Sequence, residues 1–117
     1  MKINTKKNQD GFLQVECVEL EKWKDGEKLV RFLKREFFAR VTKKVEGPDS
    51  RRWFLTVEKV RVSVDQSDWG DLAIAALEIN GEPVIVKIAE RLKTVPVDFE
   101  GVSVGPFEQL IALFRRR

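Results

Sequence analysis

Histidine and tyrosine are absent from this 117-residue sequence, and cysteine occurs once, at Cys17. Without histidine the chain cannot build a Ser-His-Asp triad or a Cys-His pair, and it lacks the commonest metal-binding side chain. One cysteine forms neither an internal disulfide nor a multi-thiolate zinc site. No Gly-x-Gly-x-x-Gly or Gly-Lys-Ser/Thr motif occurs either. We therefore expect no enzymatic activity, no cofactor and no bound metal.

Long hydrophobic runs are also missing. No apolar run approaches the roughly 20 residues that cross a bilayer, and residues 1–7 lack the apolar segment of a secretory signal. The sequence therefore predicts a cytoplasmic protein without membrane contact. Its length and its 43% hydrophobic content predict one folded domain, residues 1–117, with residues 1–10 loose. Abundant Lys, Arg and Glu, with few Asn, Gln, Met and Cys, indicate a thermophilic source.

A basic stretch rich in aromatic residues, residues 22–44, is the strongest positive signal. It holds nine Lys and Arg against three acids, and its net charge of +6 exceeds the +3 of the whole chain. Its aromatic residues are Trp23, Phe32, Phe37 and Phe38, and Arg51-Arg52-Trp53-Phe54 follows. Positive charge attracts phosphate in any sequence, and aromatic faces stack unpaired bases. The combination predicts a nucleic-acid binder, single strands first.

The hydrophobic spacing predicts an α+β fold. Alternation over residues 12–21 predicts a first strand, and apolar residues three and four apart predict a long helix over residues 25–45. Residues 51–65 read as one long strand, in which a bulge near Glu58-Lys59 would keep the apolar side chains on one face; a straight strand is the alternative.

Two further pairs of elements complete the expected fold. Residues 72–79 and 83–89 read as a hairpin joined at Asn80-Gly81. A short strand over 102–104 and a helix over 106–114 would end the chain. The expected architecture is an antiparallel sheet of about four strands, with one long basic helix packed against it and a short C-terminal helix.

A helical wheel places the basic residues of the first helix on one side. Lys24, Lys28, Arg31 and Arg35 lie opposite the apolar stripe, with Phe38 at their edge and Phe32 on the far flank. In one interpretation Phe38 and these cations contact a nucleic-acid strand. In the other, Phe32 and Phe38 pack under loops or against a dimer mate.

Strand alternation makes a second candidate surface. It places Arg52 and Phe54 on one face of the sheet and Trp53 on the other. With Arg61, this face would form a cationic groove beside Phe38, floored by aromatic rings. The alternative is a strand flanked by gatekeeper charges with one exposed Phe. Trp23 either stacks on a base or staples the entry of the helix.

The acidic segment Asp65, Asp68 and Asp71 suggests a metal site, and hence a metal-dependent nuclease as a third hypothesis. The spacing fails the calcium-loop pattern at its fifth position, and Ala76 occupies its twelfth. Ordinary turn chemistry explains these acids better. Trp69, in the same segment, is either a lid over a groove or a plug in the core.

The basic helix, the Arg51-Arg52-Trp53-Phe54 cluster and the Asn80-Gly81 hairpin together resemble the ThermoDBP group, over roughly residues 22–90. These are single-stranded DNA-binding proteins of hyperthermophilic archaea. The resemblance implies a cleft between helix and sheet that takes up bases, with cations along its rim. The founding member has a C-terminal leucine-zipper extension, whereas this chain ends at Arg117 without heptads, which puts dimerisation by coiled coil in doubt.

The sequence therefore predicts a non-enzymatic single-stranded DNA-binding protein with little sequence specificity. RNA stays open as the ligand, because both polymers offer phosphates and π-faces. A homodimer stays open as well, and the alternative function is an interaction module with exposed aromatics. The expected binding residues are Trp23, Lys24, Lys28, Arg31, Arg35, Phe38, Arg51, Arg52, Phe54, Arg61 and Trp69.

Overall fold

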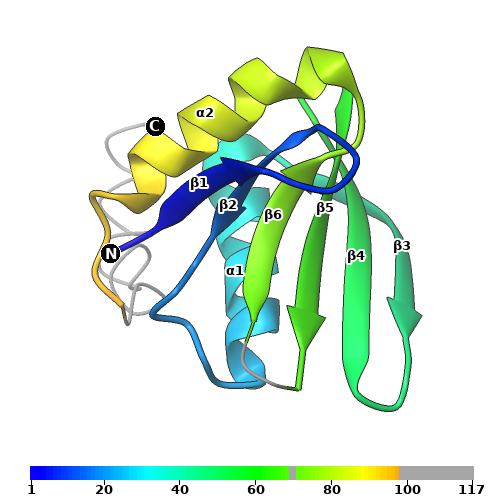
Figure 1. Ribbon diagram of the computed structural model, residues 1–117, viewed down its shortest axis with the longest axis vertical. Helices are drawn as coiled ribbons and strands as arrows, with labels where there is room; N and C mark the ends of the chain where they lie inside the picture. Colours follow the sequence, from blue (N-terminus) through cyan, green and yellow to red (C-terminus); the bar gives the residue numbers. More distant parts are fainter. Residues whose placement is uncertain (69–70, 98–117) are drawn as a thin grey trace, which may run out of the picture.

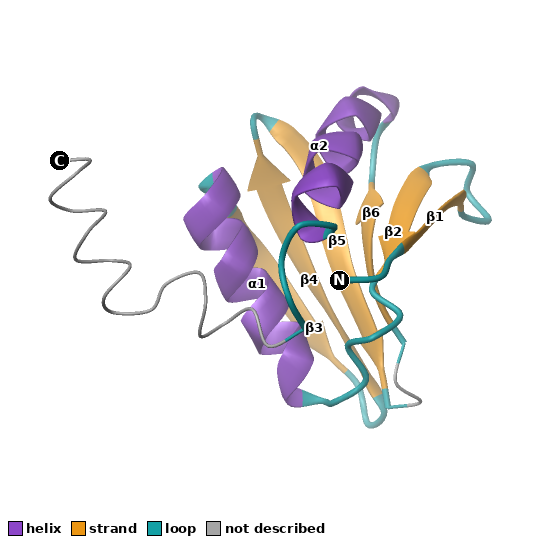
Figure 2. Cartoon of the chain, turned by 90° about the vertical axis from the view of Figure 1, so that its left-hand side faces the viewer, coloured by secondary structure: helices purple, strands orange, loops and turns teal. Residues whose placement is uncertain are grey.

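Six antiparallel strands form one sheet, and two helices pack against one of its faces (Figure 1, Figure 2). The computed structural model describes residues 1–68 and 71–97. The strand order is β1-β2-β6-β5-β4-β3. In chain order the elements are β1 (Asn4–Lys7), β2 (Leu13–Glu16), α1 (Lys24–Phe37), β3 (Arg40–Glu46), β4 (Ser50–Val57), β5 (Val60–Ser67), β6 (Leu72–Ala76), the 3₁₀ turn η1 (Ile79–Gly81) and α2 (Glu82–Leu92). The predicted α+β class is confirmed, but the expectation of about four strands is wrong.

The core lies between the helices and one face of the sheet. Along that face Val15, Ile74, Val64 and Trp53 are paired in register across β2, β6, β5 and β4, and all four are buried. Over them lie the apolar side of α1 and the apolar side of α2 in a single cluster. Each fully buried side chain of this size contributes about 1.5–3 kcal/mol to folding. The helix residues buried there include Leu29, Phe32, Leu33, Ile85, Ile88 and Leu92.

The first helix is shorter than the sequence predicts, because it ends at Phe37 and residues 40–46 form β3. Phe38 takes the left-handed conformation, with φ 54°, and its N–H and that of Ala39 both donate to the carbonyl of Leu33. Glycine usually occupies such a helix end, since a Cβ disfavours positive φ. The sequence has no glycine here, so nothing in it signals the stop. Val41 and Val45 continue the four-residue spacing past the end, which made β3 read as helix.

The long strand predicted over residues 51–65 is wrong as well: β4 and β5 form a tight hairpin. Glu58 and Lys59 have φ of 52° and 70°, and Val57 pairs with Val60 across them. Two left-handed residues between paired strands make a type I′ turn. In a two-residue hairpin, odd-numbered residues of one strand pair with even-numbered residues of the other. The buried apolar residues have odd numbers before the turn and even numbers after it. This change reflects a reversal of the chain and not a bulge.

The hairpin predicted at Asn80-Gly81 is wrong too. The strand before it is present as β6, but these two residues belong to η1, and α2 replaces the second strand. Gly81 is buried, and a Cβ there would lie 3.2 Å from the Cβ of Ala76. Pro83, in the first turn of α2, suits a helix start. The Val and Ile residues of this segment have a preference for strands. The segment is nevertheless a helix, because a helix packs its apolar side into the core.

The N-terminal region differs from the prediction in two ways. Its first predicted strand is shorter than expected, and the segment before it forms a strand. β2 covers four of the ten residues predicted as a strand over 12–21, and residues 4–7, expected to be loose, pair with it as β1. The Met1 ammonium donates to the carbonyls of Leu92 and Lys93, 3.3 Å away in each case. In the described part of the chain, no helix is long and apolar enough to cross a membrane.

The strand predicted over 102–104 and the helix over 106–114 lie outside the described residues.

Replacing Lys59 with Gly should stabilise the protein. An L-residue in the left-handed region costs about 1–2 kcal/mol, and glycine avoids this at the expense of more freedom in the unfolded chain. We expect Lys59→Gly to raise the free energy of unfolding by about 0.5–1 kcal/mol in urea denaturation. Lys59→Ala is the control, because it removes the same side chain and keeps the strain. Equal stability of the two variants would contradict the type I′ turn.

Candidate nucleic-acid interface

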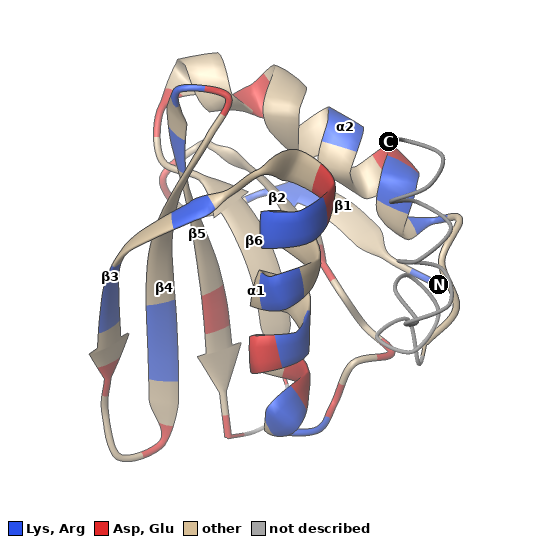
Figure 3. Ribbon diagram, turned by 180° about the vertical axis from the view of Figure 1, so that it is seen from behind, with Lys and Arg blue, Asp and Glu red and all other residues tan. Residues whose placement is uncertain are grey.

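Five basic side chains form one row along the outer side of α1, opposite its buried side. They are Lys24, Lys28, Arg31, Lys34 and Arg35, called the cation row below. Most of them are spaced three or four residues apart, so neighbouring side chains lie about 5–6 Å from each other. Lys24, Arg31 and Lys34 are exposed, and Lys28 and Arg35 are half-buried. Figure 3 shows the Lys and Arg residues of α1 as blue bands along the helix. The sequence predicted four members of the row; Lys34, on its margin, was missed.

Two acidic residues of α1, Glu27 and Glu36, turn toward neighbouring elements, whereas the third, Asp25, lies 4.0 Å from Lys28 of the cation row. The carboxylate of Glu27 accepts from Lys44 of β3 at 3.1 Å, and this hydrogen bond raises the pKa of Lys44. Glu36 accepts from Arg91 of α2 at 3.0 Å. Neither Lys24 nor Lys34 forms an ion pair with any residue in the described ranges 1–68 and 71–97. Lys24 and Lys34 therefore give the outer side of α1 positive charge that no ion pair of the described residues offsets.

The cation row opposes the stability of its own helix. Like charges three or four residues apart repel by about 0.2–0.5 kcal/mol per pair. Lys24 also sits in the first turn, where the helix dipole favours acids, whereas Lys34 and Arg35 suit the last turn. Folding alone does not require this concentration of charge.

A buried guanidinium fixes the N-terminal end of α1 on the sheet. Arg51 is 7% exposed and lies between two indole rings, 4.1 Å from the Trp23 centroid and 4.8 Å from that of Trp53. Its Nε donates to Gln66 Oε1 at 2.8 Å, and another of its nitrogens donates to the carbonyl of Trp23. Gly26 permits this close packing, since a Cβ there would lie 2.2 Å from Gln66 Oε1. Arg51 was predicted to bind nucleic acid, but its donors are occupied inside the protein.

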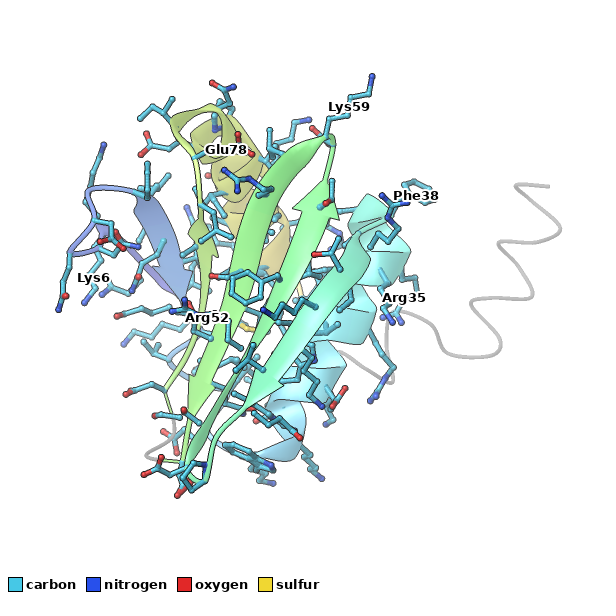
Figure 4. The ribbon with its side chains drawn as sticks, turned by 90° about the vertical axis from the view of Figure 1, so that its right-hand side faces the viewer. Lys6, Arg35, Phe38, Arg52, Lys59 and Glu78 are labelled. Carbon is cyan, nitrogen blue, oxygen red and sulfur yellow. The ribbon has the colours of Figure 1, made fainter. Side chains whose placement is uncertain are left out.

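The aromatic residues of the basic stretch separate into buried and exposed rings. Phe32, which the helical wheel placed on the far flank, is completely buried and meets Phe37 edge-to-face at 6.4 Å. Phe38 is 87% exposed and lies beyond Arg35 at the C-terminal end of α1 (Figure 4). Trp23 is 43% exposed at the other end, where its ring stacks on the Arg51 guanidinium. One exposed ring therefore flanks each end of the cation row.

The second predicted surface lies on the opposite face of the sheet, so the expected groove shared with α1 does not form. Phe54 is in register with Ser63 and Ala75 on the face that neither helix covers. Arg52 is ion-paired with Asp65 and lies over the Phe54 ring at 5.8 Å. Figure 4 labels Arg52 on this open face.

This open face is not a cationic surface. Arg61 pairs with Glu78 at 3.4 Å, and Lys6 pairs with Glu16 at 2.9 Å and lowers the pKa of that carboxyl. A hollow of about 1130 Å³ lies over it. The charged residues that line this hollow are Glu16, Glu21, Asp65, Asp68 and Asp71 against Arg51 and Arg52. A phosphate backbone would meet more negative than positive charge there.

The single cysteine is buried, and Asp65 of the acidic segment is ion-paired. Burial raises the pKa of the Cys17 thiol to about 12, so it stays protonated at neutral pH and is a poor nucleophile. Within residues 1–68 and 71–97, no group of three or more Cys, Asp or Glu side chains is placed to hold a metal ion. Asp65 instead accepts from Ser63 at 3.1 Å and pairs with Arg52. Trp69 lies outside the described residues.

Comparisons with family models, curated proteins and solved structures find no match for the chain. The resemblance to the ThermoDBP group therefore stays a prediction from the sequence pattern.

Two adjacent arginines of β4 should respond very differently to the same substitution. Lysine cannot reproduce the forked hydrogen bonds and ring stacking of a guanidinium. We expect Arg51→Lys to lower the free energy of unfolding by about 2–3 kcal/mol, because hydrogen bonds to a buried charge are lost. Arg52→Lys, the control on the open face, should cost less than about 1 kcal/mol. Similar losses in urea denaturation would show that the stack does not hold α1 in place.

Proposed function

We propose that this protein is a non-enzymatic nucleic-acid-binding domain that holds a single DNA strand along α1 with little sequence preference. The observation that carries the proposal is the cation row: five basic side chains on one side of a helix, two of whose three acids, Glu27 and Glu36, pair with other elements. Lys and Arg that replace the counterions of phosphates bind any sequence. RNA offers the same phosphate chemistry, so it is the second ligand to test.

The shape of the surface also favours a strand over a small anion. The row runs along about 17 Å of helix at 1.5 Å per residue, and its cations point outward from a convex surface. Small anions are usually enclosed by several donors, whereas a polymer gains by contacting successive charges in a line. Nothing in such contacts reads base edges, which supports low sequence specificity.

A second candidate function is an interaction module, in which Phe38 would be buried by a partner or a second copy of the chain. The 87% exposure of this ring favours it, because aromatic residues are enriched in protein interfaces. Light scattering on a sizing column separates the two functions. A stable, salt-insensitive dimer without affinity for oligonucleotides would support the interaction module.

Binding should depend strongly on salt and on the cation row. With five phosphate contacts to a single strand, the logarithm of the association constant should fall with the logarithm of salt with a slope of about −3 to −4. Lys24→Gln/Lys34→Gln should weaken binding of labelled oligo-dT roughly 10- to 30-fold at 0.1 M salt and lessen the slope by about 1.4. Fluorescence anisotropy at several salt concentrations measures both quantities, with oligo-rU as the RNA arm.

The matched control removes two lysines from α2. Lys87→Gln/Lys93→Gln changes the net charge by the same amount, but these residues pair with Glu58 and Glu90 and lie outside the cation row. We expect its affinity to stay within about twofold of the unmodified protein. If both double variants lose affinity equally, the cation row is not the binding surface. If the unmodified protein binds neither oligonucleotide, the proposed function is wrong.

A further inference from the structure

The two exposed rings at the ends of α1 are not explained by phosphate contacts. Phe38 follows the last residue of the helix and Trp23 precedes the first, so the 14 residues of α1 separate them by about 21 Å. The cation row occupies the helix between them. Phosphates do not need aromatic partners, but unpaired bases do stack on such rings.

Phe38 occupies a position that would suit another residue better for folding. Its φ of 54° is one that glycine adopts without strain. Its ring is 87% exposed, and no ring or cation contact joins it to another described residue. A phenylalanine here therefore gains little from burial while its backbone is strained. Backbone strain of this kind is concentrated at functional sites.

Trp23 is held by a cation and is still partly exposed. The Arg51 guanidinium lies 4.1 Å from its ring centroid, and 43% of the residue is still exposed. The buried cation therefore fixes the indole and leaves its other surface accessible. A ring fixed in advance loses little conformational freedom when a base stacks on it.

We propose that Phe38 and Trp23 are two stacking platforms for unpaired bases, one at each end of the cation row. This inference rests on the proposed function and specifies its ligand. At about 3.4 Å per nucleotide of one strand, the separation of the rings corresponds to a single strand of about six nucleotides. A duplex keeps its bases paired and stacked inside the helix, so it offers the row phosphates but offers the rings nothing.

The decisive variant is Phe38→Gly, because a structural and a functional role of this ring predict opposite effects. Removing the ring should weaken oligo-dT binding roughly tenfold, while relief of the backbone should raise the urea midpoint or leave it unchanged. Phe38→Trp keeps a stacking face and should bind as well as the unmodified protein or better. A lower midpoint with unchanged affinity would show that Phe38 serves the fold and would overturn the proposal.

Oligonucleotides of different length, and single-stranded against double-stranded DNA, test the two stacking platforms directly. Affinity for oligo-dT should rise steeply up to about six nucleotides and slowly beyond that length, where only statistical placement adds. A 12-base-pair hairpin should bind more weakly than dT12 in the unmodified protein, and the difference should be smaller in Phe38→Gly, where only the Trp23 platform remains. Equal affinity for hairpin and dT12, together with the loss in Lys24→Gln/Lys34→Gln, would overturn the stacking proposal and leave the proposed function standing.

The Trp23 platform has its own optical signal. In a Trp69→Phe background the remaining indoles are Trp23 and Trp53, and Trp53 is 2% exposed. Oligo-dT should quench the tryptophan fluorescence of this protein, and the additional change Trp23→Phe should remove most of the quenching while a stacking ring remains. Quenching that persists in the double variant would exclude Trp23 as a platform.

Discussion

The placement of α1 depends on the buried guanidinium of Arg51. It lies between Trp23 and Trp53 and donates to Gln66 and to the carbonyl of Trp23, so one side chain joins β4, β5 and the start of α1. A buried cation is costly unless its donors are satisfied, and here rings and oxygens surround it. Together with the burial of the apolar side of α1 in the core, this contact orients the cation row outward.

Ion pairing differs between the open face of the sheet and the outer side of α1. On the open face of the sheet Arg52, Arg61 and Lys6 each have a carboxylate partner. On α1 two of the three acids, Glu27 and Glu36, pair with β3, β4 and α2, and Lys24 and Lys34 have no carboxylate partner among the described residues. The fold therefore places positive charge on one surface, and the field of such a surface extends over about a Debye length.

Sequence patterns predicted the chemistry of α1 better than they predicted its end. The helical period fixes the angle between side chains whatever the tertiary context, so the basic and apolar sides were correct. The chain then reverses or turns at Phe38, Glu58 and Lys59, all with positive φ and none of them Gly or Asn. Turn signals in a sequence reflect intrinsic preferences, and at these positions the surrounding structure overrides the preference. The glycine at position 81, the strongest such signal, serves instead as a close contact between η1 and β6.

By itself the sequence determined that histidine chemistry is absent, that one side of a helix is basic, and that Arg52 and Phe54 face away from Trp53. These properties depend only on composition and on local periodicity. Only the tertiary structure decided that Arg51 is buried, that Arg52 is neutralised by Asp65 on the far face, and that Phe38 is exposed. Those outcomes depend on partners distant in the chain, such as Gln66 and Trp23 for Arg51, which come together only through the register of the sheet.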